Sequence, residues 1–77
     1  MYYFYIYADV NGKITEFDIC CAENSALKAL GLFAIYNYGF IVYDVRRHPI
    51  TDKDYLDSLQ RDLERTRAKR AAKGWPC

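Results

Sequence analysis

The sequence has few cysteines and histidines, which stabilise small proteins through disulfides or metal ions, and few prolines and glycines. Its 77 residues include one histidine, two prolines, four glycines and three cysteines. Cys20 and Cys21 are adjacent, and neighbouring residues of a strand point to opposite faces, where they do not form an ordinary disulfide. The third cysteine is Cys77. This odd number and spacing exclude a paired disulfide framework and indicate a reducing compartment, so we expect a cytoplasmic protein.

The residues that would carry metal binding or catalysis are also sparse. Cys20, Cys21, His48 and Cys77 lack the C-x₂-C spacing of zinc sites, so we expect no metal and no cofactor. His48 has neither a clear acidic partner nor a nucleophile near it in the sequence, which makes it a poor catalytic candidate. There is no phosphate-binding loop, dinucleotide fingerprint or nucleophile elbow. We therefore expect that the protein is not an enzyme.

Long apolar runs are absent as well, and the sequence begins without a basic leader. We therefore expect neither a membrane span nor export. Aromatic residues, in contrast, make up 17% of the chain. Large aromatic side chains let a short chain bury more area per residue, so a single domain over residues 1–77 is feasible. We expect a core over residues 1–50 and a C-terminal helix with a basic end over residues 51–74.

The net charge of +1 hides an asymmetry between the two parts of the chain. Residues 1–45 hold five acidic and two basic residues, whereas residues 46–77 hold nine basic and five acidic ones. This distribution indicates two surfaces of different charge.

Residues 2–21 predict one β-hairpin around the turn Asn11-Gly12. Both central residues of a type I′ turn need positive φ, and asparagine followed by glycine meets that need best. The two-residue loop sets the register, with Val10 opposite Lys13. Because side chains alternate along a strand, one face should form a core of Phe4, Ile6, Ala8, Val10, Phe17 and Ile19.

The other face of the hairpin is the candidate partner-binding surface. It carries Tyr3, Tyr5, Tyr7, Glu16 and Asp18. High β-propensity and partial cover by a second helix would explain the tyrosines without any function. Tyrosine is also enriched at interface hot spots and can stack on nucleobases. The two carboxylates would repel phosphates and would suit a basic protein surface.

A helix is predicted from about residue 24 to residue 38. Leu27, Leu30 and Ala34 recur at helical spacing and are expected to face the sheet, while Ala26, Leu30 and Phe33 form a second such series. Gly31, in mid-helix, suggests a close approach to that sheet.

A third strand is predicted over residues 40–47, ended by Pro49. Its inner face is expected to hold Ile41, Tyr43 and Val45. Its outer face is then Phe40, Val42, Asp44 and Arg46.

The second helix is expected to start at Thr51 as N-cap, with Asp54 in its first turn. An apolar stripe then follows at Leu56, Leu59 and Leu63. Beyond Leu63 the helix should project from the body and end at Gly74 and Pro76. Its basic residues are candidates for binding nucleic acid: Arg61, Arg65, Arg67, Lys69, Arg70 and Lys73. A solvated helix end, favoured by the helix dipole, is the alternative explanation.

These elements predict an α+β fold of order β-β-α-β-α. A right-handed crossover puts the first helix on one sheet face. With the third strand beside the first, the sheet is three-stranded and antiparallel, in the order 2-1-3.

The joint from Ile19 to Leu30, with the hairpin before it and Tyr43 to Arg46 after it, is similar to small β-β-α-β proteins of bacteriophages and mobile elements. Some anti-CRISPR proteins have this general build. The resemblance covers roughly residues 2–47 and is one of residue types. It implies a compact, non-catalytic protein that blocks a host defence complex by surface contact, in the host cytoplasm.

Three hypotheses of function follow. The first is a non-enzymatic protein-binding module that inhibits or modulates a nucleic-acid-handling complex. The second is a small DNA- or RNA-binding protein that uses the basic helix. The third is a structural homodimer, formed through the sheet face or the leucine stripe.

Overall fold

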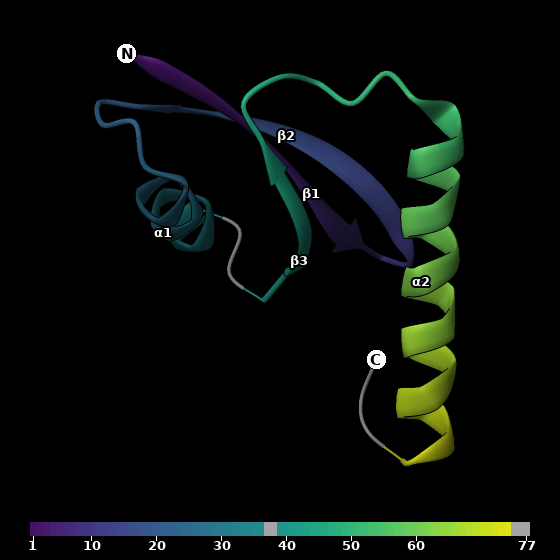
Figure 1. Ribbon diagram of the computed structural model, residues 1–77. Helices are drawn as coiled ribbons and strands as arrows, with labels where there is room; N and C mark the ends of the chain where they lie inside the picture. Colours follow the sequence, from purple (N-terminus) through teal and green to yellow (C-terminus); the bar gives the residue numbers. More distant parts are fainter. Residues whose placement is uncertain (37–38, 75–77) are drawn as a thin grey trace.

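The computed structural model describes residues 1–36 and 39–74. Along the chain the elements are β1 (Tyr2–Val10), β2 (Lys13–Cys21), α1 (Ala26–Tyr36), β3 (Ile41–Arg46) and α2 (Lys53–Ala72). The three strands form one antiparallel sheet in the order β2-β1-β3, so the predicted α+β fold and topology are confirmed. The two helices lie on opposite sides of this sheet (Figure 1).

The hairpin has the predicted turn and register. Asn11 and Gly12 have φ of +53° and +89°, as a type I′ turn requires. Pairing runs without a shift from Tyr2 opposite Cys21 to Val10 opposite Lys13. Because the turn is only two residues long, it alone decides which side chains share a face.

The α1 helix begins one residue after Ser25, whose Oγ accepts a hydrogen bond from the Lys28 N–H at 3.3 Å. The predicted start at residue 24 is therefore two residues early. The predicted end at residue 38 lies outside the described residues. A serine hydroxyl in this position satisfies one of the unpaired N–H groups of the first turn.

The face that α1 turns to the sheet differs from the prediction. Ala29 and Phe33 are buried, whereas Leu27 is 80% exposed. Phe33 packs edge-on against Phe17, with ring centroids 5.1 Å apart. The prediction that Leu27 and Ala34 face the sheet is wrong, because the sequence of α1 is apolar on most sides and Phe33, which packs on Phe17, takes the interior position.

Gly31 also lies on the outward side of α1. A Cβ atom built on Gly31 would meet no other atom within 4 Å. The expected close approach to the sheet is therefore wrong. Since a glycine inside a helix costs about 1 kcal/mol relative to alanine, the fold of a single chain gives no reason for this residue.

A β-bulge in β3 changes which of its residues face α1. Tyr7 lies opposite Asp44 but Ala8 lies opposite Val42, so Tyr43 is an extra residue. Val42 and Val45 therefore both pack against the core of Ile6, Ala8 and Phe33. The prediction that Val42 points outward is wrong. Ile41, predicted to point inward, pairs with Asp9 on the other face.

The N-cap of α2 is Asp52, not Thr51. The Asp52 carboxylate accepts hydrogen bonds from the N–H groups of Asp54 and Tyr55 at 3.0 and 3.4 Å. The helix ends near Gly74, whose φ of +76° matches the predicted stop. Pro76, the other predicted terminator, lies outside the described residues.

The α2 helix packs against the turn end of the hairpin. Leu59 and Leu63 are buried, as the apolar stripe predicts. The Gln60 amide donates to the Gly12 carbonyl at 2.8 Å and accepts from the Ile14 N–H at 2.9 Å. These bonds give partners to backbone groups at the edge of the sheet, where no further strand of the described chain pairs with β2. Contact with the sheet continues to Arg67, so the helix stays on the body for one turn longer than predicted.

Candidate binding surfaces

The three tyrosines of the hairpin have different environments. Tyr3 is 56% exposed and Tyr5 is half-buried, but Tyr7 is only 2% exposed. The Tyr7 hydroxyl donates to Glu16 Oε1 at 2.7 Å and accepts from the Ile50 N–H at 2.7 Å. Burial and the hydrogen bond to Glu16 raise the pKa of Tyr7.

Tyr7 is therefore an interior residue and offers no contact area to a partner. The physical reason is the connection between β3 and α2, which brings the backbone N–H of Ile50 within hydrogen-bonding distance of the Tyr7 hydroxyl. The predicted surface shrinks to what we call the acidic–aromatic face. It consists of Tyr3, Tyr5, Glu16 and Asp18.

The acidic–aromatic face is built on adjacent strands. Tyr5 pairs with Asp18, and Tyr3 lies two residues along the same strand and on the same side. Glu16 and Asp18 are both exposed. The Cα atoms of alternate residues of a strand stand about 7 Å apart, so the two carboxylates lie close together on one face of β2.

Asp44, on β3, is the centre of a polar network that sequence reasoning missed. Its carboxylate accepts from the Tyr55 hydroxyl at 2.6 Å, from Arg46 Nε at 3.0 Å and from the Val45 N–H at 2.8 Å. The Arg46 guanidinium lies 5.0 Å from the centroid of the Tyr55 ring. Burial acts to raise the pKa of Asp44, but these hydrogen bonds outweigh it and hold the pKa below its ordinary value.

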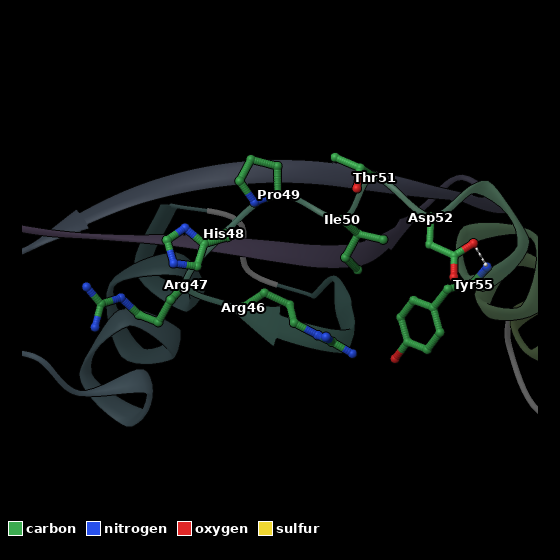
Figure 2. Close-up of a pocket in the computed structure, with 8 residues that line it drawn as sticks. All are labelled: Arg46, Arg47, His48, Pro49, Ile50, Thr51, Asp52 and Tyr55. Carbon is green, nitrogen blue, oxygen red and sulfur yellow. Dashed lines mark hydrogen bonds between the residues drawn. The ribbon is translucent and has the colours of Figure 1, made fainter.

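An open hollow of about 460 Å³ lies beside this network, over the connection from β3 to α2. Figure 2 shows Arg46 and Arg47 pointing to opposite ends of it, with the Arg46 side chain directed toward Tyr55. Arg47 donates to the Tyr3 carbonyl and to Asn24 Oδ1, and its guanidinium lies over the rings of Tyr2 and Phe4. Both arginines therefore have partners inside the chain.

Arg67 was predicted as a nucleic-acid contact, but it is tied to the sheet. Its Nε and Nη2 atoms donate to the two carboxylate oxygens of Asp9 at 3.0 and 3.2 Å. The Asp9 side chain is 7% exposed and also accepts from the Gly12 N–H. Burial acts to raise the pKa of Asp9, but the bonds from Arg67 and Gly12 and the charge of Arg70 outweigh it and lower the pKa.

The other basic side chains from residue 61 to residue 73 form what we call the basic end. Its residues are Arg61, Arg65, Lys69, Arg70 and Lys73. Arg70 is half-buried and the rest are exposed. Arg65 pairs with Asp62 across 3.5 Å, as its i,i+3 spacing predicts. This half of α2 extends past the sheet (Figure 1).

The structure shows two of the three cysteines. Cys20 is exposed and Cys21 is buried, and both are free thiols. Across residues 1–36 and 39–74, no three His, Cys, Asp or Glu side chains gather in a way that could hold a metal ion. Within the same residues, no helix combines the length and apolar character needed to cross a membrane.

Comparison with protein-family models, with curated protein sequences and with solved structures gave no match to this chain.

Proposed function

We propose that the chain is a non-enzymatic protein-binding module that inhibits or modulates a nucleic-acid-handling complex by surface contact. The observation that carries the proposal is the acidic–aromatic face. It joins exposed carboxylates to tyrosines on a sheet that α1 and α2 brace from two sides. A rigid strand surface costs little entropy on binding.

The charge of this face favours a basic partner. Glu16 and Asp18 are exposed on β2, and complementary potentials speed encounter and select partners. Proteins that hold DNA or RNA present basic grooves, so an acidic surface that occupies such a groove would compete with the nucleic acid. The resemblance to anti-CRISPR proteins points to a host defence complex of this kind, in the cytoplasm.

The test is inhibition of DNA binding by purified CRISPR effector complexes, measured with this protein and two charge-reversal variants. Asp18→Lys should weaken inhibition at least tenfold. The matched control Asp57→Lys makes the same charge change at an exposed residue of α2 and should leave inhibition unchanged. Equal inhibition by both variants would show that the partner does not contact the acidic–aromatic face.

Tyrosine contributions are tested on Tyr3 and Tyr5, because Tyr7 is buried. If these two are hot spots, the double change to alanine should cost about 2 kcal/mol or more of binding free energy. Circular dichroism of the variant checks that the sheet is retained.

A second candidate function, binding of DNA or RNA by the basic end, is favoured by the exposure of Arg61, Arg65 and Lys69. Because Arg67 is held by Asp9, four basic residues remain between Arg65 and Lys73. If all four neutralise phosphates of duplex DNA, the log–log salt slope should be about −3 to −4.

Fluorescence anisotropy of short DNA and RNA at several salt concentrations measures this slope. The variant with Arg61, Arg65 and Lys69 all changed to Gln should lose the binding while keeping the fold. No binding at low salt would rule out this candidate and leave a protein partner.

A further inference from the structure

The outward face of α1 is apolar and lacks a partner within the described chain. Leu27 and Ile35 are 80% and 72% exposed, and they lie four residues to either side of Gly31. Ala34, which is also exposed, lies beside them. The opposite side of the same helix carries the buried Ala29 and Phe33, which pack on the sheet, so Leu27 and Ile35 are not needed for the core.

Gly31 is at the centre of that face. It lowers the stability of the helix, and a Cβ atom there would meet nothing within 4 Å. Glycine on a helix surface allows another backbone to approach closely. A residue that weakens the isolated chain and serves no contact within it indicates a contact outside the chain.

We propose that α1 pairs with α1 of a second copy of this chain, antiparallel, with the two helices crossing at Gly31. The arrangement is self-complementary, as a two-fold interface requires. A two-fold axis at Gly31 sets each Leu27 against the Ile35 of the other copy, so large side chains flank a small centre on both helices.

The charges of α1 select the antiparallel direction. Lys28 is the one charged residue in the sequence of α1, all of which the structure describes, and its Nζ lies 2.8 Å from Glu23 Oε1. A parallel pair would place the like-charged ends of the two helix dipoles together. In an antiparallel pair, each Lys28 lies beside the C-terminal turn of the other helix, where the carbonyl groups carry partial negative charge and α1 has no basic residue of its own.

A hollow beside Gly31 offers room for the second copy. It holds about 380 Å³ and lies between α1 and the end of β2, with Leu32, Ile35 and Cys21 among its lining residues. The contact is limited to one 11-residue helix from each copy, so the interface is small beside the roughly 1,200–2,000 Å² of a stable specific one. A weak dimer is therefore expected, with a dissociation constant in the micromolar range.

This dimer goes beyond the proposed function and does not depend on it. The acidic–aromatic face is on the side of the sheet away from α1, so each copy in the dimer keeps that face uncovered. A dimer would offer two such faces to a partner, which raises avidity where both can engage.

Sedimentation equilibrium tests the proposal at concentrations up to several hundred micromolar. The natural chain should form a dimer, and Ile35→Glu should weaken it at least 100-fold. Gly31→Leu distinguishes a specific helix crossing from non-specific hydrophobic association. Leucine favours the helix, and its Cβ meets open space within the chain. Its side chain blocks the crossing, however, so the dimer should weaken at least tenfold while Tm rises.

Tyr3→Ala is the control, since it removes an exposed aromatic side chain from the sheet and should leave the dimer unchanged. Circular dichroism of each variant checks the fold. A natural chain that stays monomeric throughout would overturn the proposal. So would a dimer that Ile35→Glu leaves intact, or one that Gly31→Leu strengthens.

Discussion

Individual polar side chains attach α2 to the sheet at three separate points. Tyr55 reaches Asp44 on β3, Gln60 reaches the backbone of the hairpin turn, and Arg67 reaches Asp9 on β1. Each contact joins a polar side chain of α2 to a polar group of the sheet or its turn. In a domain this small, such contacts matter because burial alone leaves a narrow margin of stability.

The Asp9–Arg67 contact allows a direct test with a matched control. Arg67→Met removes the guanidinium but keeps Asp9 buried, so the free energy of unfolding should fall by about 2–3 kcal/mol. Arg65→Met makes the same change at an exposed ion pair and should cost less than about 0.5 kcal/mol. Urea unfolding followed by circular dichroism measures both. Equal losses in the two variants would show that burial of Asp9 does not set the cost.

Acid should destabilise the protein through Asp9 and Asp44. Both carboxyls have a folded-state pKa below the ordinary value of 3.8. Their contribution to stability is therefore complete above the unfolded-state pKa and is lost as pH falls through the folded-state values. The free energy of unfolding should begin to fall below about pH 5. Urea unfolding at a series of pH values measures the fall.

The Arg67→Met variant is the control for this pH dependence. Without the guanidinium, the hydrogen bonds and charge of Arg67 no longer lower the pKa of Asp9, and only the Gly12 N–H and the charge of Arg70 still do so. The loss of stability on acidification should then be smaller than in the natural chain. An unchanged pH dependence would assign the effect to other carboxyls.

Among the secondary-structure elements, the hairpin was predictable and the outward face of α1 was not. The hairpin register depends on two adjacent residues, Asn11 and Gly12, and a local signal of that kind is visible in one sequence. The orientation of α1 depends on how well each apolar side chain fits the sheet. Leu27 and Phe33 are equally apolar in a pattern, and only packing distinguishes them.

The bulge at Tyr43 and the contacts of α2 were also not predictable, because no local sequence signal marks them. A bulge shifts the alternation of β3 without any glycine or proline to mark it. Asp9 and Arg67 are 58 residues apart, and no local spacing connects them. The candidate surface was thus half predictable: its strand face followed from the register, but the cover over Tyr7 came from a segment whose path has no local signal.

The start of α2 gives a prediction at the level of the element. Asp52→Ala should cost about 1 kcal/mol of unfolding free energy, because the N–H groups of Asp54 and Tyr55 lose their acceptor. Thr51→Ala, one residue earlier, should stay within about 0.5 kcal/mol. Thermal and urea unfolding of the two variants compare them. If Thr51→Ala lowered the free energy of unfolding more than Asp52→Ala, Thr51 would be the N-cap, as the sequence pattern predicts.

For the whole molecule, the charge asymmetry of the sequence is partly neutralised inside the fold. Two acids of the first 45 residues, Asp9 and Asp44, pair with Arg67 and Arg46 from the basic part of the chain. Of the exposed charges that remain, Glu16 and Asp18 lie together on β2, and Arg65, Lys69 and Lys73 lie near the C-terminal end of α2. The two candidate partners, a basic protein surface and a nucleic acid, therefore correspond to two separate regions of the surface.

The same pairing means that the basic half of α2 cannot be removed without affecting the sheet. Deleting residues 65–77 takes away Arg67, so Asp9 loses its partner and the turn that it holds through the Gly12 N–H should loosen. Hydrogen exchange at Gly12 should speed up by about tenfold or more, since each 1.4 kcal/mol lost in opening is one factor of ten. A chain that ends at residue 72 keeps Arg67 and should retain its protection. If both truncations exchange alike, the end of α2 and the hairpin turn are not coupled through Asp9, and loss of nucleic-acid binding on truncation could then be assigned to the basic end directly.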